Sequence, residues 1–145
     1  MDRVTNEIST TALFEAFFSC QKILRNALDL RELHLTRQQF YTLMALAGPK
    51  KLTMGQVAES IVVSREQATR IVAPLVEEGY IERCSDDSNR KLVLVQLTER
   101  GQEFIDREKD YVRKQLEDRF EHLTQVETER FLKCVSELKE ILEKI

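Results

Sequence analysis

The feature that most constrains this chain is a helix-start signal that occurs three times within residues 36–67. In each copy a Thr or Ser is followed three residues later by Gln: Thr36 with Gln39, Thr53 with Gln56, and Ser64 with Gln67. This is the spacing of a capping box, in which the hydroxyl and the Gln side chain each accept a backbone N–H at the start of a helix. The three copies predict helices over about 36–47, 53–60 and 64–78, the first ended by Gly48-Pro49 and the last by Gly79.

The third predicted helix has two different faces. One face is apolar and is expected to pack inward: Ala68, Ile71, Val72 and Leu75. The other is polar near the helix start and acidic at the far end: Glu66, Arg70, Ala73 and Glu77, flanked by Gln67, Thr69 and Pro74. A polar amino-terminal half is what a DNA recognition helix needs, and a merely solvated face is the alternative. Pro74 is expected to kink this helix.

A β-hairpin is predicted directly after Gly79. Residues 80–84 and 91–97 have strand character, and the second run alternates Val93, Val95 and Leu97 with Leu92, Leu94 and Gln96. The turn between the two runs ends in Arg90 and Lys91. Such cations suit a wing that reaches into a minor groove, although an ordinary charged hairpin would look the same in isolation.

Apolar stripes run along the helices predicted at both ends of the chain. Within residues 10–33 they fall at a spacing of four and three: Leu13, Phe17, Cys20, Leu24 and Ala27. Thr124 and Glu127 form a fourth capping box that divides the rest into helices of about 98–122 and 125–144, and the last helix repeats the spacing: Phe131, Val135, Leu138, Leu142 and Ile145. We favour an intersubunit helical bundle over packing within one chain.

The predicted fold class is therefore mostly α with a small β-hairpin wing. One domain of 145 residues would hold a winged helix-turn-helix lobe at 35–100 and dimerisation helices at 10–34 and 101–145. A chain of this length can bury a core without disulfides or metal. Hydrophobic residues make up 42% and charged residues 32%, with four glycines and two prolines, and this composition favours a helix-rich globular protein.

Several function classes are disfavoured by the composition. The three cysteines and two histidines are isolated along the sequence, so we expect no metal site, and no cofactor motif or catalytic constellation suggests an enzyme. No signal peptide or long apolar run is present, which predicts a cytoplasmic protein without a membrane partner. The net charge is −3, yet residues 35–100 carry nine basic and eight acidic groups and are the one segment that is not net negative.

The chain resembles the MarR-type transcriptional regulators. The resemblance rests on LTRQQFYTLMAL (35–46), on residues 52–83 and on the LTERG that follows the wing (97–101). It implies a homodimer whose first and last helices interlock and a pseudo-palindromic operator in double-stranded DNA. The implied DNA contacts are Ser64, Arg65, Gln67, Thr69, Arg70, Arg90 and Lys91. The interface stripe would include Leu13, Phe17, Phe131, Val135, Leu138 and Leu142.

Two of these positions have a particular interpretation. Arg65 lies nearer the buried edge of its helix on a helical wheel and could extend to a phosphate. In the wing, Asn89-Arg90-Lys91 stands where similar proteins usually have Asp, any residue, Arg. Since Lys lacks the planar fork of Arg, we expect Arg90 to contact the minor groove and the wing to be held in another way.

The resemblance also implies an effector, often a small aromatic or phenolic molecule. Candidate lining residues are Phe14, Phe17, Phe18, Phe40 and Tyr41, although simple packing of the junction is the favoured interpretation. Cys20, in the apolar stripe, is expected to be a buried core thiol, and Cys84 at the base of the wing the more exposed one. A redox-responsive regulator and a winged-helix protein-interaction module remain as alternatives.

Overall fold

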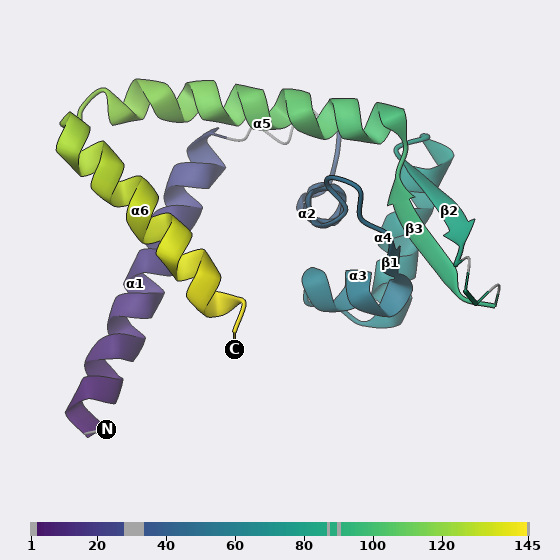
Figure 1. Cartoon of the computed structure of the whole chain (residues 1–145), viewed down its shortest axis with the longest axis horizontal. Coiled ribbons are helices and arrows are strands. Elements are labelled where there is room, and N and C mark those ends of the chain that lie inside the picture. Colours follow the sequence, from purple (N-terminus) through teal and green to yellow (C-terminus); the bar gives the residue numbers. More distant parts are fainter. Residues whose placement is uncertain (1–2, 28–33, 87, 90, 145) are drawn as a thin grey trace. The chain divides into compact units, whose positions relative to one another are not determined.

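The computed structural model of the chain describes residues 3–27, 34–86, 88–89 and 91–144, with the side chains of 3–8 left aside. The elements, in order, are α1 (Arg3–Ala27), α2 (Arg37–Ala45), β1 (Leu52–Thr53), α3 (Met54–Ser60), α4 (Arg65–Glu77), β2 (Ile81–Ser85), β3 (Val93–Leu97), α5 (Glu99–Phe120) and α6 (Gln125–Leu142) (Figure 1). The mostly helical fold with a small sheet is confirmed. Two compact units divide the chain, Met1–Asp110 and Tyr111–Ile145, and each is described by itself.

All four predicted capping boxes form. At α4, for example, the backbone N–H of Gln67 donates to Ser64 Oγ at 3.2 Å, and the backbone N–H of Ser64 donates to Gln67 Oε1 at 3.1 Å. Thr36, Thr53 and Thr124 cap α2, α3 and α6 in the same way. Each helix begins at the residue after its cap, because the cap has an extended backbone, although its carbonyl oxygen already accepts the first helical hydrogen bond.

The sheet has three strands in the order β1-β3-β2, and both pairings are antiparallel. Strand β1 was not predicted, because it has only two residues. Along β3 the predicted alternation places Val95 in the core cluster and Leu97 against it, and Leu94 is buried outside that cluster. The central position of β3 accounts for this: Leu94 lies opposite Thr53 and Cys84 on the two flanking strands, so its surroundings are filled from both sides.

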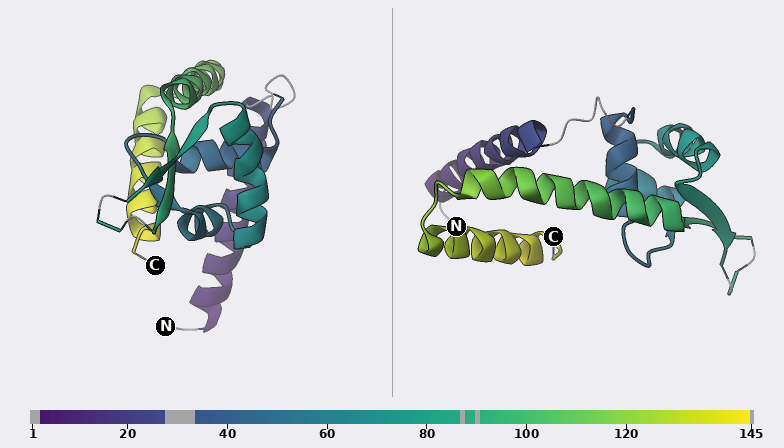
Figure 2. Two further views of the ribbon diagram at one scale, coloured as in Figure 1. Left: turned by 90° about the vertical axis from the view of Figure 1, so that its right-hand side faces the viewer. Right: turned by 90° about the horizontal axis from the view of Figure 1, so that it is seen from above.

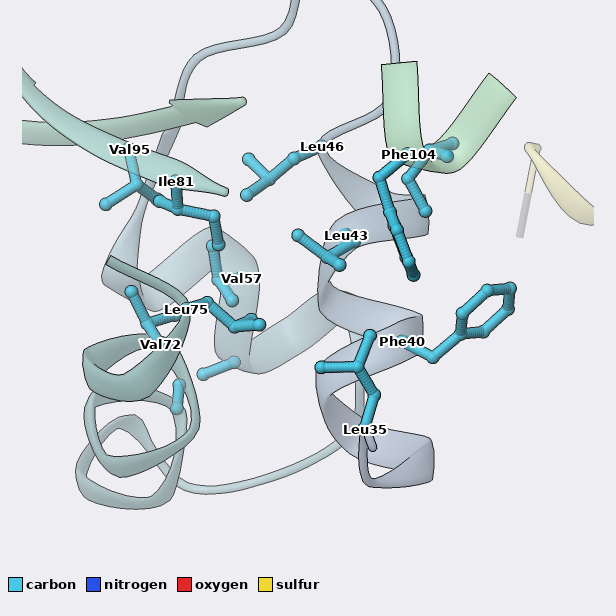
Figure 3. Packing of buried hydrophobic residues seen from close by; sticks show 13 residues of the cluster. Leu35, Phe40, Leu43, Leu46, Val57, Val72, Leu75, Ile81, Val95 and Phe104 are labelled. Carbon is cyan, nitrogen blue, oxygen red and sulfur yellow. The ribbon is translucent and has the colours of Figure 1, made fainter. Parts of the chain in front are cut away.

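The core of the lobe lies where three helices meet the sheet and the start of α5 (Figure 3). Residues from every one of these elements are fully buried, among them Leu43, Leu46, Val57, Val72, Leu75, Val95 and Ile105. On α4 the predicted inward face is confirmed for Ala68, Val72 and Leu75, while Ile71 is half-buried. The polar face of α4 is thereby turned away from the core.

The first turn of α5 is tied to the end of α4 through Thr98. The hydroxyl of Thr98 donates to the carbonyl oxygen of Gly79 at 2.6 Å and accepts from the backbone N–H of Gly101 at 3.0 Å. A Cβ atom at residue 101 would overlap the carbonyl oxygen of Tyr80, so only glycine fits there. These contacts make the beginning of α5 part of the lobe.

The terminal helices expose their apolar stripes. Helix α1 begins at Arg3 rather than near residue 10, and the end predicted for it at 33 lies outside the described residues. The expectation of a buried Cys20 is wrong, because Cys20 is exposed, as are Leu13, Phe17 and Leu24 of the same stripe, while Ala27 is buried. In the second unit, α6 follows α5 after a short turn (Figure 2), and the rings of Phe120 and Phe131 lie 5.2 Å apart.

Candidate nucleic-acid interface

The amino-terminal half of α4 presents a continuous polar surface. Every predicted contact on this helix is exposed: Ser64, Arg65, Gln67, Thr69 and Arg70. The helix therefore brings five of the seven predicted DNA contacts together. Arg65 was expected near the buried edge, but it is exposed, since its position precedes the first core residue of the helix, Ala68.

Local hydrogen bonds already engage part of this surface. The capping box engages Ser64 Oγ and Gln67 Oε1, and the Thr69 hydroxyl donates to the carbonyl oxygen of Arg65 at 3.0 Å. Thr69 therefore offers its methyl group and oxygen lone pairs, and Gln67 offers its amide N–H groups. Arginine is the side chain best suited to guanine, because its fork matches the two acceptors on the major-groove edge.

Glu66 adds a negative charge to the same surface. The pKa of its carboxyl group is lowered by a backbone hydrogen bond, by the Ser64 hydroxyl, and by the nearby guanidinium groups of Arg65 and Arg70. The carboxylate is thus ionised at neutral pH, and the helix start places a hydrogen-bond acceptor between donors. In the major groove such an acceptor matches the exocyclic amino group of cytosine.

The wing is closed by Asp86 and Asn89. Asp86 Oδ1 accepts from the backbone N–H of Ser88 at 2.7 Å, from its hydroxyl at 2.5 Å and from the backbone N–H of Asn89 at 3.2 Å. These bonds lower the pKa of Asp86, with a smaller contribution from Lys51. Asn89 Oδ1 in turn accepts from the backbone N–H of Lys91 at 3.2 Å. The turn thus takes its shape from side chains that bond to its own backbone.

The two predicted DNA contacts of the wing are Arg90 and Lys91. Lys91 is exposed at the start of the returning strand. Arg90 lies outside the described residues. Figure 2 shows the β2–β3 hairpin projecting beyond the helices of the lobe, and β2 packs against α4.

Comparison with known proteins agrees with this geometry. A family model described as MarR family matches residues 34–92. The Bacillus subtilis regulator YpoP is 29% identical over 124 residues, which cover 81% of this chain and 84% of YpoP. The chain is therefore similar to the MarR family over residues 34–92. Other matches are shorter: YybA of Bacillus subtilis is 30% identical over 74 residues, 51% of this chain and only about half (49%) of YybA.

Three further similarities concern a curated repressor and two solved structures. The transcriptional repressor MprA of Escherichia coli is 48% identical over 42 residues, which cover 29% of this chain and 24% of MprA. Among solved structures, a MarR family protein from Bacillus stearothermophilus has a TM-score of 0.77 at 20% identity, and Streptococcus pneumoniae FabT in complex with DNA has 0.63 at 20% identity. In both, 99% of each chain is covered, which shows that the MarR fold extends along the whole chain.

The aromatic residues considered for an effector cleft lie in different environments. Phe40 belongs to the core of the lobe and its ring lies 6.4 Å from that of Tyr41, which is exposed. Phe14, Phe17 and Phe18 are exposed on α1, with the last two rings 5.7 Å apart in an edge-on arrangement. Core packing therefore explains Phe40 without a ligand.

The residues predicted for the dimer interface are exposed in the single chain. Leu13 and Phe17 on α1, and Phe131, Val135, Leu138 and Leu142 on α6, keep between 37% and 58% of their surface accessible. Of the cysteines, Cys84 is half-buried and Cys134 is exposed, so the expectation that Cys84 is more exposed than Cys20 is wrong. In the described part of the chain, no three His, Cys, Asp or Glu residues are grouped so as to hold a metal ion, and no helix could span a membrane.

Val62, in the turn between α3 and α4, is a residue of this surface that the sequence did not predict. Its side chain is 90% exposed, and its φ of 56° lies in the left-handed region. A β-branched residue is a genuine outlier in that conformation. The sequence carries no glycine or asparagine at this helix end, the residues that usually mark a left-handed reversal, so no local signal indicated one.

Proposed function

We propose that this chain is a sequence-specific DNA-binding regulator of transcription that acts as a homodimer on a pseudo-palindromic operator and carries out no catalysis. The observation that carries the proposal is the two-sided character of α4. Ala68, Val72 and Leu75 are fully buried, so the opposite face, with Arg70 flanked by Gln67 and Thr69, looks outward. A helix held this firmly can present side chains to base edges in a fixed register.

Dimerisation is supported by the exposed apolar stripes of the terminal helices. Large apolar side chains that recur at the spacing of a helical seam usually pack against another helix. On α6 all the described residues are at least partly exposed, so none of its apolar side chains is fully buried within the single chain. Two winged lobes joined through such helices would read two half-sites about one turn of DNA apart.

The charge distribution fits a division of roles on the DNA. Arg65, Arg70 and Lys91 are exposed, and contacts from such groups to phosphate supply most of the salt-dependent affinity. Base-edge contacts from α4 would add specificity. The name of MprA as a repressor and the DNA bound to FabT support repression through operator binding. Release by a small aromatic ligand is part of the same proposal, with Phe14, Phe17 and Tyr41 as accessible candidates.

The proposal is tested by fluorescence polarisation with duplexes that the purified protein enriches from a random-sequence library. We expect binding that is roughly a thousandfold tighter than to a scrambled duplex of the same length. The affinity should fall steeply between a low and a high salt concentration. Failure to enrich any sequence, with equal weak binding to all duplexes, would reject sequence-specific recognition.

A paired variant separates DNA binding from a role as a protein-interaction module. Arg70→Ala should weaken binding to the enriched duplex by about 1–3 kcal/mol if Arg70 contacts a base. Arg113→Ala, in a helical ion pair with Glu117 on α5, serves as the matched control and should leave binding unchanged. The module interpretation would be favoured if both variants bound the duplex as weakly as wild type.

A further inference from the structure

The turn between α3 and α4 is a Schellman motif with an unusual residue at its reversal. The backbone N–H of Val62 donates to the carbonyl oxygen of Glu59 at 3.2 Å, and that of Val63 donates to Ala58 at 3.0 Å. This pair of bonds requires the left-handed conformation at residue 62, which glycine adopts without cost. Valine there brings its two γ-methyl groups close to the backbone.

The same motif ends α4, with the usual residue. Gly79 has a φ of 78°, its N–H donates to Val76 at 3.0 Å, and the N–H of Tyr80 donates to Leu75 at 2.9 Å. The two turns have the same hydrogen bonds and differ at the left-handed position. The chain therefore has glycine at the left-handed position after α4 and valine at the left-handed position before α4, the proposed recognition helix.

Nothing in the described fold compensates for this valine. Its side chain is 90% exposed, more than the other large apolar residues for which exposure is known. It therefore gains almost no burial within the lobe. Strained residues persist where they serve a function, and an observed outlier is a sound starting point for such an inference.

The surroundings of Val62 indicate what it would contact. It lies two residues before Ser64, the N-cap of α4, so it borders the surface that carries Arg65, Gln67 and Thr69. An apolar group at this edge has one apolar counterpart in the major groove, the C5 methyl group of thymine. We propose that Val62 is a specificity-determining residue that packs on a thymine methyl group in each half-site, an inference that rests on the proposed DNA binding.

The test is a cycle between protein and DNA. Each thymine of an enriched duplex is replaced in turn by deoxyuridine, which lacks only the methyl group, and binding is measured for wild type, Val62→Gly and Val62→Thr. At one position per half-site, wild type should lose about fourfold in affinity on removal of the methyl group. Val62→Gly should bind the two duplexes equally, and it should unfold at a higher temperature than wild type because the strain is relieved.

Val62→Thr is the matched control, since it keeps the branched shape and the backbone strain but replaces one methyl group by a hydroxyl. It should remain as thermally stable as wild type within a narrow margin and discriminate thymine from deoxyuridine less well. If Val62→Gly bound both the thymine and the deoxyuridine duplex more weakly than wild type by the same factor, Val62 would contact the sugar-phosphate backbone. That result would overturn the thymine assignment. Unchanged discrimination in Val62→Gly would overturn it as well.

The two levels of the proposal fail differently. If wild type enriches no sequence and binds every duplex alike, the proposed function is rejected and this inference with it. If wild type binds an enriched duplex tightly but no thymine can be distinguished from deoxyuridine, the regulator stands and only the role of Val62 is rejected.

Discussion

The winged lobe and the terminal helices carry similar apolar periodicity but use it differently. In α4, Val72 and Leu75 have no accessible surface, whereas on α6 Phe131 keeps 37% and Leu138 keeps 45% of theirs. In the lobe, helices, sheet and the start of α5 cover one another, so each apolar face has a partner within the chain. An apolar stripe thus predicts that a helix face is buried, but it does not say which surface covers that face. For α1 and α6 we propose that a second copy of the chain covers it.

The largest expected effect is on the closure of the lobe itself. Gly101→Ala places a Cβ atom on the carbonyl oxygen of Tyr80, and that carbonyl is also held by the backbone N–H of Thr98 at 3.0 Å. We expect a loss of about 3 kcal/mol in the free energy of unfolding, measured by urea denaturation. Gly55→Ala is the control, because its Cβ would meet only Thr53 Oγ1 at 3.7 Å, and it should leave stability nearly unchanged.

The next largest effect is expected on dimerisation through the exposed apolar stripe of α6. Leu138→Asp should leave the lobe folded but weaken dimerisation by about 30-fold or more, because a charge replaces an apolar group in the proposed seam. Analytical ultracentrifugation measures the change. Ser136→Asp, on a neighbouring exposed position of α6, is the control and should dimerise like wild type. A monomeric wild type would show instead that the stripes of the terminal helices are not completed by self-association.

A smaller effect separates two capping boxes of the lobe. Thr53→Ala and Ser64→Ala should each cost about 1 kcal/mol in the free energy of unfolding, since each removes one acceptor at a helix start. Only Ser64→Ala should also weaken binding to an enriched duplex, because it removes the hydrogen bond that holds Gln67 and the first turn of α4. Equal affinities of the two variants for DNA would contradict that role of the α4 cap.

The smallest effect is a pH dependence confined to α6. Its capping box uses Glu127, whose pKa is lowered by hydrogen bonds from the backbone N–H and hydroxyl of Thr124, whereas the boxes of the lobe use Gln. A folded pKa below the usual 4.5 means that the stabilisation is present above that value and is lost as pH falls through the lowered pKa.

Titration of the Glu127 carboxyl by NMR should reveal the lowered pKa, and the amide signals at the start of α6 should broaden in acid. Glu127→Gln converts this cap to the type used in the lobe, so it should keep the helix start and remove its pH dependence. Persistence of the acid transition in Glu127→Gln would assign it to another group.

Much of the candidate site was predictable because its determinants are local. The start of α4, its inward face and the exposure of Arg70 follow from residues three or four positions apart. The strain at Val62 was not predicted, because it depends on hydrogen bonds that reverse the chain between two helices. The wing turn at Asp86 was expected only as a turn, and its pattern of three bonds to one carboxylate oxygen became visible in three dimensions.

The amino-acid sequence by itself determined where the helices of this protein begin, because a capping box is satisfied within four residues, and it determined which side of α4 turns inward. Only the tertiary structure decided that Leu52 and Thr53 join β3 as a third strand, that Leu94 is buried beside Val95, and that Cys20 is exposed. These outcomes depend on partners distant in sequence, and an apolar side chain is buried only where another surface comes to cover it.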